Sequence, residues 1–521
     1  MLLGIIDISI VVAYTIFIIV IAQYVSREKV GHSKNAQDYF LAGKALPWWA
    51  IGASLIAANI SAEQIIGMSG SGFVIGLGIA SYEWMGAITL LIVGRYFLPI
   101  FLQNEIYSMP QFLEKRYDGR VRLVMAIFWL GLYIFVNLTS ILWLGALAVN
   151  AITGIELTYG LIMLGGCAVA YSLYGGLKAV ALTDIIQVAL LVFGGLMVSA
   201  ISLNQIGGEQ GVWGGFIELT EQLPEKFDMI ISPESEHYKD LPGLSVLIGG
   251  MWMMNLSYWG FNQYVIQRAL AAKNLAEARK GILFACFLKI LMPVIVVLPG
   301  IAAALIIPDL DAPDQAYPEM MKLLPVGIKG LVFAALIAAI LSSLGSMMNS
   351  ISTIFTMDIY RQIKTNVDDN KLVTIGRVAG LTSMVIAIII AKPLLGNFSQ
   401  AFQFIQEFTG FFTPGIVVIF LLGLFWKKAT ANSALVAGIG SFVFSIILRE
   451  YWPDFPFIDR VGIVFILCGV LAIAISYIAP EPEINNTIIK SESDRDTVDS
   501  AFIIGSIAIT IIISSLYITW W

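Results

Sequence analysis

Long apolar runs dominate this sequence and restrict what it can fold into. About fourteen of them, each roughly 20 residues long, recur along the 521-residue chain. Continuous runs of that length are typical of membrane-spanning α-helices, whereas strands of membrane β-barrels alternate over about ten residues. We therefore expect an all-α integral membrane protein with about 14 transmembrane helices, at 4–24, 47–68, 78–103, 121–150, 157–176, 179–203, 245–268, 279–307, 328–356, 374–392, 400–426, 432–449, 460–479 and 500–521.

Charged residues are scarce, which excludes several classes of protein. Only 13% of the chain is charged and 58% is hydrophobic, whereas a soluble domain carries about 25% charged residues. The net charge is −6, and no basic block favours nucleic acid. Three cysteines, Cys167, Cys286 and Cys468, lie inside apolar runs and are expected as thiols. With two histidines (His32 and His237) and no nucleophile elbow, P-loop or HExxH motif, we expect neither an enzyme nor a histidine metal site.

Lysine and arginine gather in alternate connections, which predicts the orientation. Cytoplasmic loops carry the excess of basic residues, so these connections are expected in the cytoplasm and both termini outside. The glutamate-rich connection 204–244 then lies outside, and 480–499 is a solvated cytoplasmic linker. The basic residues are Arg27, Lys29, Lys34, Lys44, Lys115, Arg116, Arg120, Lys273, Arg279, Lys280, Arg361, Lys364, Lys427 and Lys428.

A polar stretch interrupts the second span within 51–72. Residues 48–58 are apolar, and Asn59, Ser61, Glu63 and Gln64 follow. At 1.5 Å per residue this point lies about 18 Å deep, near the middle of a hydrocarbon core about 30 Å thick. Polar side chains are tolerated there only where they face protein or water, and transporters use such broken helices to hold an ion and a substrate. We therefore predict a sodium-driven symporter of a small polar solute, with a sugar favoured.

Two charged residues are expected inside the membrane. Glu83 enters the third span, and Lys289 lies nine residues beyond Lys280, about 14 Å deep. Glu83 could instead end a helix in water, and the two charges could form a purely structural ion pair. The functional interpretation is that they share a polar cavity and contact the substrate. Since Glu83 offsets Lys289 and we expect no spare arginine at that depth, an anionic substrate is disfavoured.

Amides beside aromatic rings point to a sugar. Asn255 lies about ten residues into the seventh span, close to Tyr258 and Trp259. Sugar hydroxyls need paired donors and acceptors, and the C–H face of the ring stacks on an aromatic side chain. The alternative is ordinary interhelical packing with an interfacial aromatic residue.

Hydroxyl and carboxyl groups suggest where a cation could bind. Ser342 and Ser343 follow Ala339 in the ninth span; taken alone, such serines more often bond their own helix. Combined with carbonyls from the broken stretch they could hold Na⁺, which needs only neutral oxygens. Asp184 is interpreted as a helix cap, with an ion exit path as the alternative.

Gln406, next to Glu407, lies in a segment that is either a flexible helix or a gate.

These motifs together resemble the sodium/solute symporter family. The resemblance is greatest to its sodium–glucose cotransporter branch, in particular to bacterial galactose-transporting members. It covers 25–428 and weakens after Asn432. The motifs that carry it are GASLIAANISAEQ, ASYEW, YIFVNLTS, YWGFNQYVIQR, LLPVGIKGLVFAAL, ILSSLGSMMNS and FQFIQEFTG.

The resemblance implies a LeuT-like 5+5 inverted repeat core with discontinuous helices. Spans two to eleven would form the core in a bacterial inner (plasma) membrane. An N-terminal extra helix and cytoplasmic loop would occupy 1–46, the first repeat 47–203 and an extracellular acidic loop 204–244. The second repeat would occupy 245–428, and C-terminal extra helices 429–521. Alternating access would move Na⁺ and a neutral sugar together across the lipid bilayer, and a homo-oligomer is compatible with this fold.

The resemblance also implies a set of site residues. Gly86 stands where a galactose-transporting member is expected to have serine, which puts the sugar preference in doubt. Ser257 also replaces an aromatic residue. The implied sugar-binding residues are Gln64, Glu83, Asn255, Lys289 and Gln406, with Tyr258 as inner gate and Trp259 beside it; the outer gate is Met68, Tyr82 and Phe402; Na⁺ is held by the carbonyls of Ala57, Ile60 and Ala339 and the hydroxyls of Ser342 and Ser343; Asn59, Tyr133 and Asn137 support the gate, and Asp184 lies on the sodium exit route.

Other functions remain open at this stage. The nearest is sodium symport of inositol, sialic acid or an amino acid. A solute-sensing membrane module and a passive channel belong to other classes, and they would show no sodium-driven accumulation.

Overall fold

The computed structural model describes residues 3–26, 46–106, 108–172, 177–364, 367, 369–396, 400–480 and 499–521. Arg27, Lys29, His32, Lys34, Lys44 and nearly all of the linker 480–499 lie outside these ranges. The described part is helical, and its only paired extended residues are Leu46 and Ala272.

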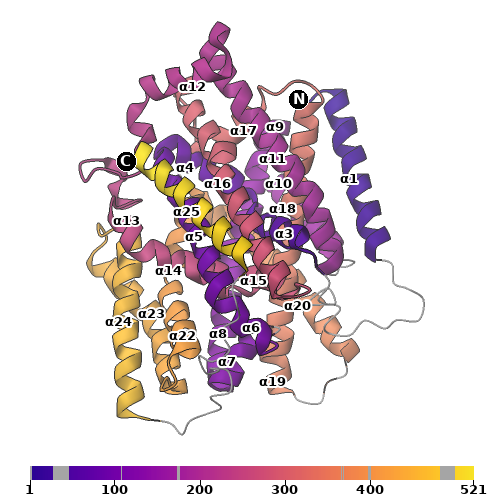
Figure 1. Cartoon of the computed structure of the whole chain (residues 1–521). Helices are drawn as coiled ribbons and strands as arrows, with labels where there is room; N and C mark the ends of the chain where they lie inside the picture. Colours follow the sequence, from indigo (N-terminus) through magenta and orange to yellow (C-terminus); the bar gives the residue numbers. More distant parts are fainter. Residues whose placement is uncertain are drawn as a thin grey trace.

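The chain crosses the length of the molecule many times (Figure 1). The helices that make up the expected spans are α1 (Ile5–Ser26), α3 (Trp48–Asn59), α4 (Met68–Val74), α5 (Ser81–Ile92), α6 (Leu98–Gln103), α8 (Gly119–Gly131), α9 (Thr139–Thr153), α10 (Leu157–Ser172), α11 (Leu177–Gly207), α14 (Gly250–Leu256), α15 (Gln263–Leu270), α16 (Leu275–Ile306), α18 (Ile328–Thr353), α20 (Asp369–Leu395), α21 (Ala401–Thr409), α22 (Thr413–Phe425), α23 (Ala431–Tyr451), α24 (Phe457–Ile478) and α25 (Ser500–Thr519). Further helices lie in or beside the connections: α7 (Met109–Arg116), α12 (Gly211–Gln222), α13 (Ser245–Ile248), α17 (Ala316–Met321) and α19 (Arg361–Ile363).

Each expected span falls on helix. In the described part, nine helices are long and apolar enough to cross a membrane, or up to eleven if each bent pair counts as one span. The bent pairs are α3 with 63–74, at 62°, and α21 with α22, at 45°. The expected loop 204–244 is only partly a loop, because α11 continues to Gly207 and α12 follows.

The core helices pack in two groups. α16 lies along α3, α4, α5 and α11, whereas α18 packs against α1, α10, α11 and α20. α23 and α24 stand beside α14 and α22, and α25 crosses the outside of α16 and α5. In Figure 1, α25 is the yellow helix running diagonally over this surface, and both chain ends point toward the end that carries α12.

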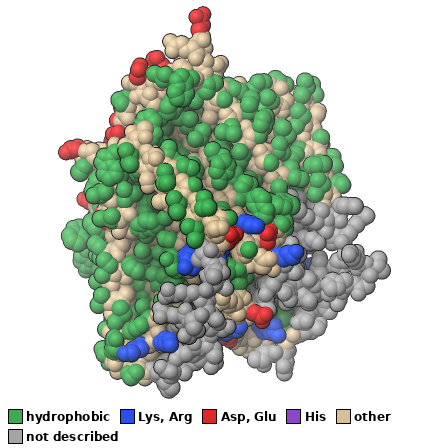
Figure 2. Space-filling model, in the orientation of Figure 1, with side chains coloured by type: hydrophobic (Ala, Val, Ile, Leu, Met, Phe, Trp, Pro, Cys, Tyr) green, Lys and Arg blue, Asp and Glu red, His purple; other side chains and the backbone are tan. Residues whose placement is uncertain are grey.

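The surface separates by chemistry. A broad belt of hydrophobic side chains covers the helices in Figure 2, as lipid contact requires. Acidic side chains are concentrated toward the α12 end of this face, whereas most of its lysines and arginines lie toward the opposite end. We call these the acidic end and the basic end.

Local irregularities open the helices near their centres. π-helical turns, in which one extra residue loosens the backbone, occur at Glu63–Gly67 and Ser257–Phe261. After the second, Asn262 is extended and its side chain accepts a hydrogen bond from the amide of Tyr264, in the first turn of α15. The seventh expected span is therefore broken as well, a detail that hydropathy alone did not reveal.

Candidate functional site

The predicted interruption lies where α3 ends at Asn59. Ile60 leaves the helical conformation, and the chain turns by 62° before it re-enters a helix. The amide of Ser61, which would bond the carbonyl of Ala57 in a continuous helix, bonds that of Asn59 instead, at 2.9 Å. The break thus releases backbone carbonyls inside the protein, where their dipoles can face a ligand.

Charged side chains meet beside this break. Lys289 of α16 places Nζ 2.6 Å from Oε2 of Glu83 in α5, and both side chains are about 1% exposed. The same Nζ donates to Oδ1 of Asn59 at 2.7 Å, and Gln64 Nε2 donates to Glu83 Oε1. Each charge is therefore paired and hydrogen-bonded, as burial requires. The water-exposed alternative for Glu83 is wrong.

Trp259 and Asn255 form an adjoining wall. The Lys289 ammonium lies 4.6 Å from the centre of the Trp259 ring. Asn255 is buried and donates from Nδ2 to the carbonyl of Met251, 3.2 Å away. A Cβ built on Gly86 would lie 2.9 Å from Asn255 Oδ1 and 3.0 Å from Trp259 Nε1. The Gly86 position therefore faces the site, and Asn255 occupies the space that a side chain there would need.

Two aromatic pairs adjoin the residues of this site. Tyr258 makes an edge contact with Trp259, with ring centroids 5.1 Å apart, and its hydroxyl accepts from Asn59 Nδ2 at 3.4 Å. Tyr82, which precedes Glu83 in the chain, meets Phe402 edge-on with ring centroids 5.1 Å apart. Met68, at the start of α4, is fully buried.

The α21 segment carries the next predicted residue. Gln406 is half-buried and lies four residues after Phe402, so both side chains share one face of α21. Its neighbour Glu407 pairs with Arg460 at 2.8 Å and with Arg449 at 3.3 Å. These ion pairs join α21 to α23 and α24 near the 45° bend.

Hydrogen bonds connect the expected sodium-binding serines to α3, the helix that ends at the break. Tyr264 donates to the carbonyl of Ala58 at 3.1 Å and shares a hydrogen bond with Ser343. Ser342 donates to Oδ1 of Asp184 at 3.0 Å, so it does not simply bond its own helix. Buried carbonyl and hydroxyl oxygens of this kind suit a hard monovalent cation. Among the described residues no cluster of three or more His, Cys, Asp or Glu side chains could hold a metal.

Asp184 is not a helix cap. It lies seven residues after Leu177, inside α11, and is buried. Besides Ser342 it accepts from Ser54 of α3 at 3.1 Å, and Ser54 in turn accepts from Arg268 Nε at 3.1 Å. A carboxylate therefore lies next to the expected sodium-binding hydroxyls, joined to the first half of the broken helix.

Sequence reasoning missed Ser54, Tyr264 and Arg268. We expected no spare arginine at the depth of Lys289. Arg268 is buried too, but it lies beside Asp184 at the end of the seventh expected span, where it donates to Ser54 and Tyr264. The motif YWGFNQYVIQR contains both Tyr264 and Arg268, and an arginine inside an expected span would have been a signal. Ser54, in an otherwise apolar helix, carried none.

The expected supporting residues also make specific contacts. Tyr133 donates from its hydroxyl to Oδ1 of Asn262, 2.5 Å away, where α15 begins. Asn137 hydrogen-bonds the side chain of Glu63 at the start of the π-helical turn. Both come from the segment Leu132–Leu138, so one helix supports two breaks.

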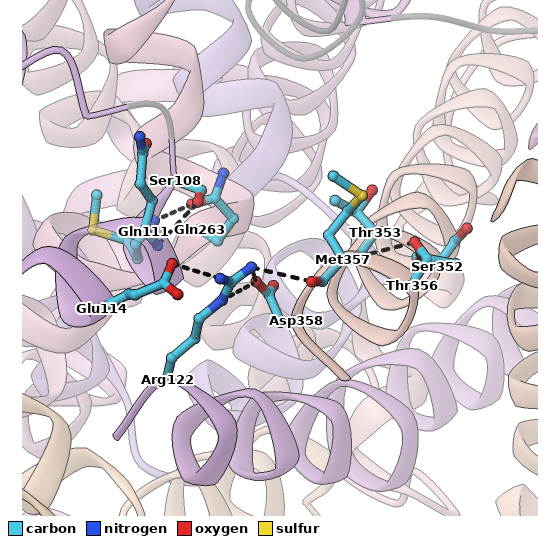
Figure 3. A network of polar contacts seen from close by, with 11 residues as sticks. Ser108, Gln111, Glu114, Arg122, Gln263, Ser352, Thr353, Thr356, Met357 and Asp358 are labelled. Carbon is cyan, nitrogen blue, oxygen red and sulfur yellow. Dashed lines mark hydrogen bonds and ion pairs between the residues drawn. The ribbon is translucent and has the colours of Figure 1, made fainter. Parts of the chain in front are cut away.

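A polar network lies at the basic end (Figure 3). Arg122 of α8 contacts Asp358 at 2.7 Å and Glu114 of α7 at 2.6 Å, and donates to the carbonyl of Met357 at 3.1 Å. Nearby, Gln263 accepts from the amide of Met109 at 2.7 Å. The network joins segments from the two halves of the core.

Together these groups can bind a polyhydroxyl compound and a cation next to one another. Glu83, Gln64 and Asn255 offer hydrogen-bond acceptors and donors. Lys289 adds donors, and its pairing with Glu83 leaves no net charge. Asn59 belongs to the break and touches both Lys289 and Tyr258, so the two regions are physically connected.

Comparison with known proteins identifies relatives of this chain. Residues 39–440 match the Sodium:solute symporter family. The chain is 49% identical to the sodium/glucose cotransporter of Vibrio parahaemolyticus, over 100% of this chain and 99% of that protein. It is 34% identical to the human sodium/myo-inositol cotransporter, over 84% of this chain and 66% of that protein. A solved Na⁺-coupled sialic acid symporter in a substrate-bound outward-open state has a TM-score of 0.79 and 22% identity, covering 92% of this chain and 99% of that one, and shares the fold.

Proposed function

Since the chain belongs to the sodium:solute symporter family, we propose that it uses the Na⁺ gradient to accumulate a neutral sugar of the galactose or glucose type. The observation that carries this proposal is the meeting of Glu83, Lys289 and Asn59 at a broken helix. A neutralised, hydrogen-bonded pair can exchange its partners for sugar hydroxyls without leaving a net charge buried. The 49% identical sodium/glucose cotransporter supports the same substrate class.

The membrane arrangement forms part of the proposal. We infer fourteen spans in a bacterial inner membrane, with a 5+5 inverted repeat over 47–203 and 245–428, the helix-bearing connection 204–244, and extra helices at 1–46 and 429–521. The basic end faces the cytoplasm and the acidic end, with both termini, faces outside. The separation of charges in Figure 2 supports this orientation.

Na⁺ is a co-substrate in this proposal. We assign its site to the carbonyls of Ala57, Ile60 and Ala339 and the hydroxyls of Ser342 and Ser343, with Asp184 on the exit route. The break at Ser61 frees backbone carbonyls of α3, and the side chains of Ser342 and Ser343 are both buried. Both observations support this assignment. Ordering Ile60 also orders Asn59, which holds Lys289 and Tyr258. Na⁺ and sugar then favour each other's binding through one segment of backbone.

The aromatic residues act as gates in this scheme. Tyr258 and Trp259 lie between the substrate and the basic end, and Met68, Tyr82 and Phe402 cover it from the acidic end. Rocking of the two helix groups opens one set at a time. Asn137 and Tyr133 steady the breaks, and Gln64, Asn255 and Gln406 complete the sugar contacts.

The available driving force is sufficient for accumulation. Moving one charge down 100 mV yields about 2.3 kcal/mol. A tenfold Na⁺ gradient adds about 1.4 kcal/mol. At one-to-one coupling the total sustains roughly a 500-fold sugar gradient.

A second candidate substrate is a cyclic polyol, supported by the 34% identity to a sodium/myo-inositol cotransporter.

Uptake into proteoliposomes that contain no internal Na⁺ separates the candidate substrates. Labelled galactose, glucose, myo-inositol, sialic acid and an amino acid are each supplied outside, with and without an inward Na⁺ gradient. We expect uphill, Na⁺-dependent uptake of one or both hexoses. Flux that ignores Na⁺ would indicate a channel, and binding without accumulation would indicate a solute sensor.

A further inference from the structure

A buried carboxyl lies at the acidic end, away from the paired charges of the site. Asp314 belongs to the turn Pro313–Gln315 between α16 and α18 and is 4% exposed. Its Oδ2 accepts from the amide of Ala401, the first residue of α21, at 3.0 Å. A Cβ on Gly70 of α4 would lie 2.5 Å from its Oδ1 and 2.9 Å from its amide nitrogen. One side chain therefore fills the point where the turn, α4 and α21 meet.

This point lies on a seam that covers the proposed sugar site. Ser71 of α4 donates to Gln400 at 3.2 Å, immediately before α21. Further along, Phe402 contacts both Tyr82 and the backbone position of Gly67. In the gating scheme proposed above, α4 and α21 separate when the site opens toward the acidic end. The contact around Asp314 must then be broken.

Among the described residues, no Lys or Arg side chain forms an ion pair with the Asp314 carboxyl. The elements packed against its turn are α4, α9, α17, 63–67 and the start of α21. Among the described residues, α4 and α9 have no titratable side chain. The titratable groups of the others are Glu63, bonded to Asn137; Tyr317; Glu319, paired with Lys322; and Glu407, paired with Arg460 and Arg449.

Asp314 Oδ1 has no hydrogen-bond partner within the described residues. Burial raises the pKa of Asp314 to about 7, opposed only in part by the Ala401 amide. A protonated carboxyl is much less costly to bury than an unpaired carboxylate.

We propose that Asp314 is a proton-binding site of the outer gate, and that its protonation holds α4, α21 and the 313–315 turn together. The proposal rests on the transport function and orientation inferred above. When the gate opens, water reaches the carboxyl and its pKa falls toward the ordinary 3.8.

The sign of the pH effect follows from linkage. The closed gate binds the proton more tightly than the open gate does. Protonation therefore stabilises the closed gate fully below pH about 4, and this stabilisation is lost as pH rises through about 7. Between pH 5.5 and 8 the ratio of open to closed gates would rise by up to roughly 30-fold. Alkaline external medium therefore favours the outward-open form.

Two measurements on the purified full chain test this. The first is hydrogen–deuterium exchange, without ligand, of peptides covering 68–74 and 401–409, corrected for intrinsic exchange at each pH. We expect faster exchange at pH 8 than at pH 5.5 in the wild type. Asp314→Asn, which keeps the acceptor for Ala401 and mimics the neutral acid, should exchange at the slow rate at both pH values. Asp311→Asn removes an exposed charge from the same loop and should behave as wild type.

The second measurement is Na⁺-stimulated binding of labelled galactose and glucose at the same two pH values. We expect several-fold tighter binding at pH 8 in wild type and in Asp311→Asn, and no pH response in Asp314→Asn. A wild-type pH response that persists in Asp314→Asn overturns the proposal. If no sugar binds at either pH, the proposed function fails, whereas the exchange measurement still decides the role of Asp314.

Discussion

Lys289 and Glu83 are 206 residues apart in the chain, yet their charged atoms lie 2.6 Å apart in the interior. Asn59 accepts a second hydrogen bond from the same ammonium and donates to Tyr258. A change at the helix break is therefore transmitted directly to the charged pair and to the aromatic wall. This contact connects the proposed cation site with the proposed sugar site.

Removing one member of the charged pair should both destabilise the protein and abolish transport. Lys289→Met leaves Glu83 as an unpaired buried charge, at a cost of about 3–5 kcal/mol. We expect a lower melting temperature in detergent and loss of Na⁺-dependent sugar uptake. Lys322→Met, which breaks a partly exposed pair with Glu319, should keep uptake.

The double variant Lys289→Met/Glu83→Gln separates the two effects. It removes both charges, so most of the lost stability should return while sugar binding remains absent. Recovery of binding in the double variant would show that the pair is structural only.

The contact between Asp184 and Ser342 should control the response to Na⁺. The Asp184 carboxylate accepts hydrogen bonds from both Ser54 and Ser342. Asp184→Asn weakens one of these two bonds and removes a negative charge near the proposed cation. A lost bond to a charged group corresponds to about 1.5–3 kcal/mol, or roughly a tenfold or greater rise in the Na⁺ concentration for half-maximal uptake. The measurement is Na⁺-dependent uptake at saturating sugar.

A serine on the same helix provides the control. Ser199 of α11 donates to the carbonyl of Val294 at 2.5 Å, away from Asp184. Ser199→Ala should leave the Na⁺ response unchanged. An equal shift in both variants would indicate a general loss of helix packing instead of a sodium site.

A side chain at position 86 should alter sugar preference. The Cβ of Gly86→Ala would lie 2.9 Å from Asn255 Oδ1, so the amide of Asn255 must move. We expect a several-fold rise in the sugar KM and a changed ratio of galactose to glucose uptake, with an unchanged Na⁺ response, because the sodium-binding groups are not touched. Competition between the two labelled sugars gives the ratio.

Gly166→Ala is the matched helix substitution for this experiment. No atom lies within 4 Å of a Cβ at Gly166, and alanine favours the helix by up to about 1 kcal/mol. Its uptake ratio should equal that of wild type. An unchanged ratio in Gly86→Ala would remove position 86 from the sugar contacts.

Arg122 should contribute stability at the basic end. Its side chain is 15% exposed and bridges Asp358 and Glu114, so its loss should cost more than the 0–1 kcal/mol of a surface pair. Thermal unfolding of Arg122→Met, Asp358→Asn and the double variant gives the coupling energy. Arg120 pairs with Asp118, but its side chain is 60% exposed, so Arg120→Met should have little effect on the melting temperature. A coupling energy near zero between Arg122 and Asp358 would exclude a stabilising role for this pair.

Much of this architecture was predictable from sequence alone. Apolar runs must be buried in lipid or protein, so each expected span became helix. The depth of Asn59 predicted a break, because an unpaired polar group in hydrocarbon costs several kcal/mol. The same cost indicated that Glu83 and Lys289 could not face lipid.

Tertiary structure decided which groups meet. Hydropathy carries no information on the rotation of one helix relative to another, so Asp184 was taken for a cap, although Ser54 and Ser342 approach it from α3 and α18. Ser54, Arg268 and Asp314 acquired their roles only through packing against segments 80 or more residues away. The sequence determined which side chains had to be buried, because transfer into lipid is a property of single residues. The fold alone decided their partners, because a hydrogen bond depends on positions that distant parts of the chain set together.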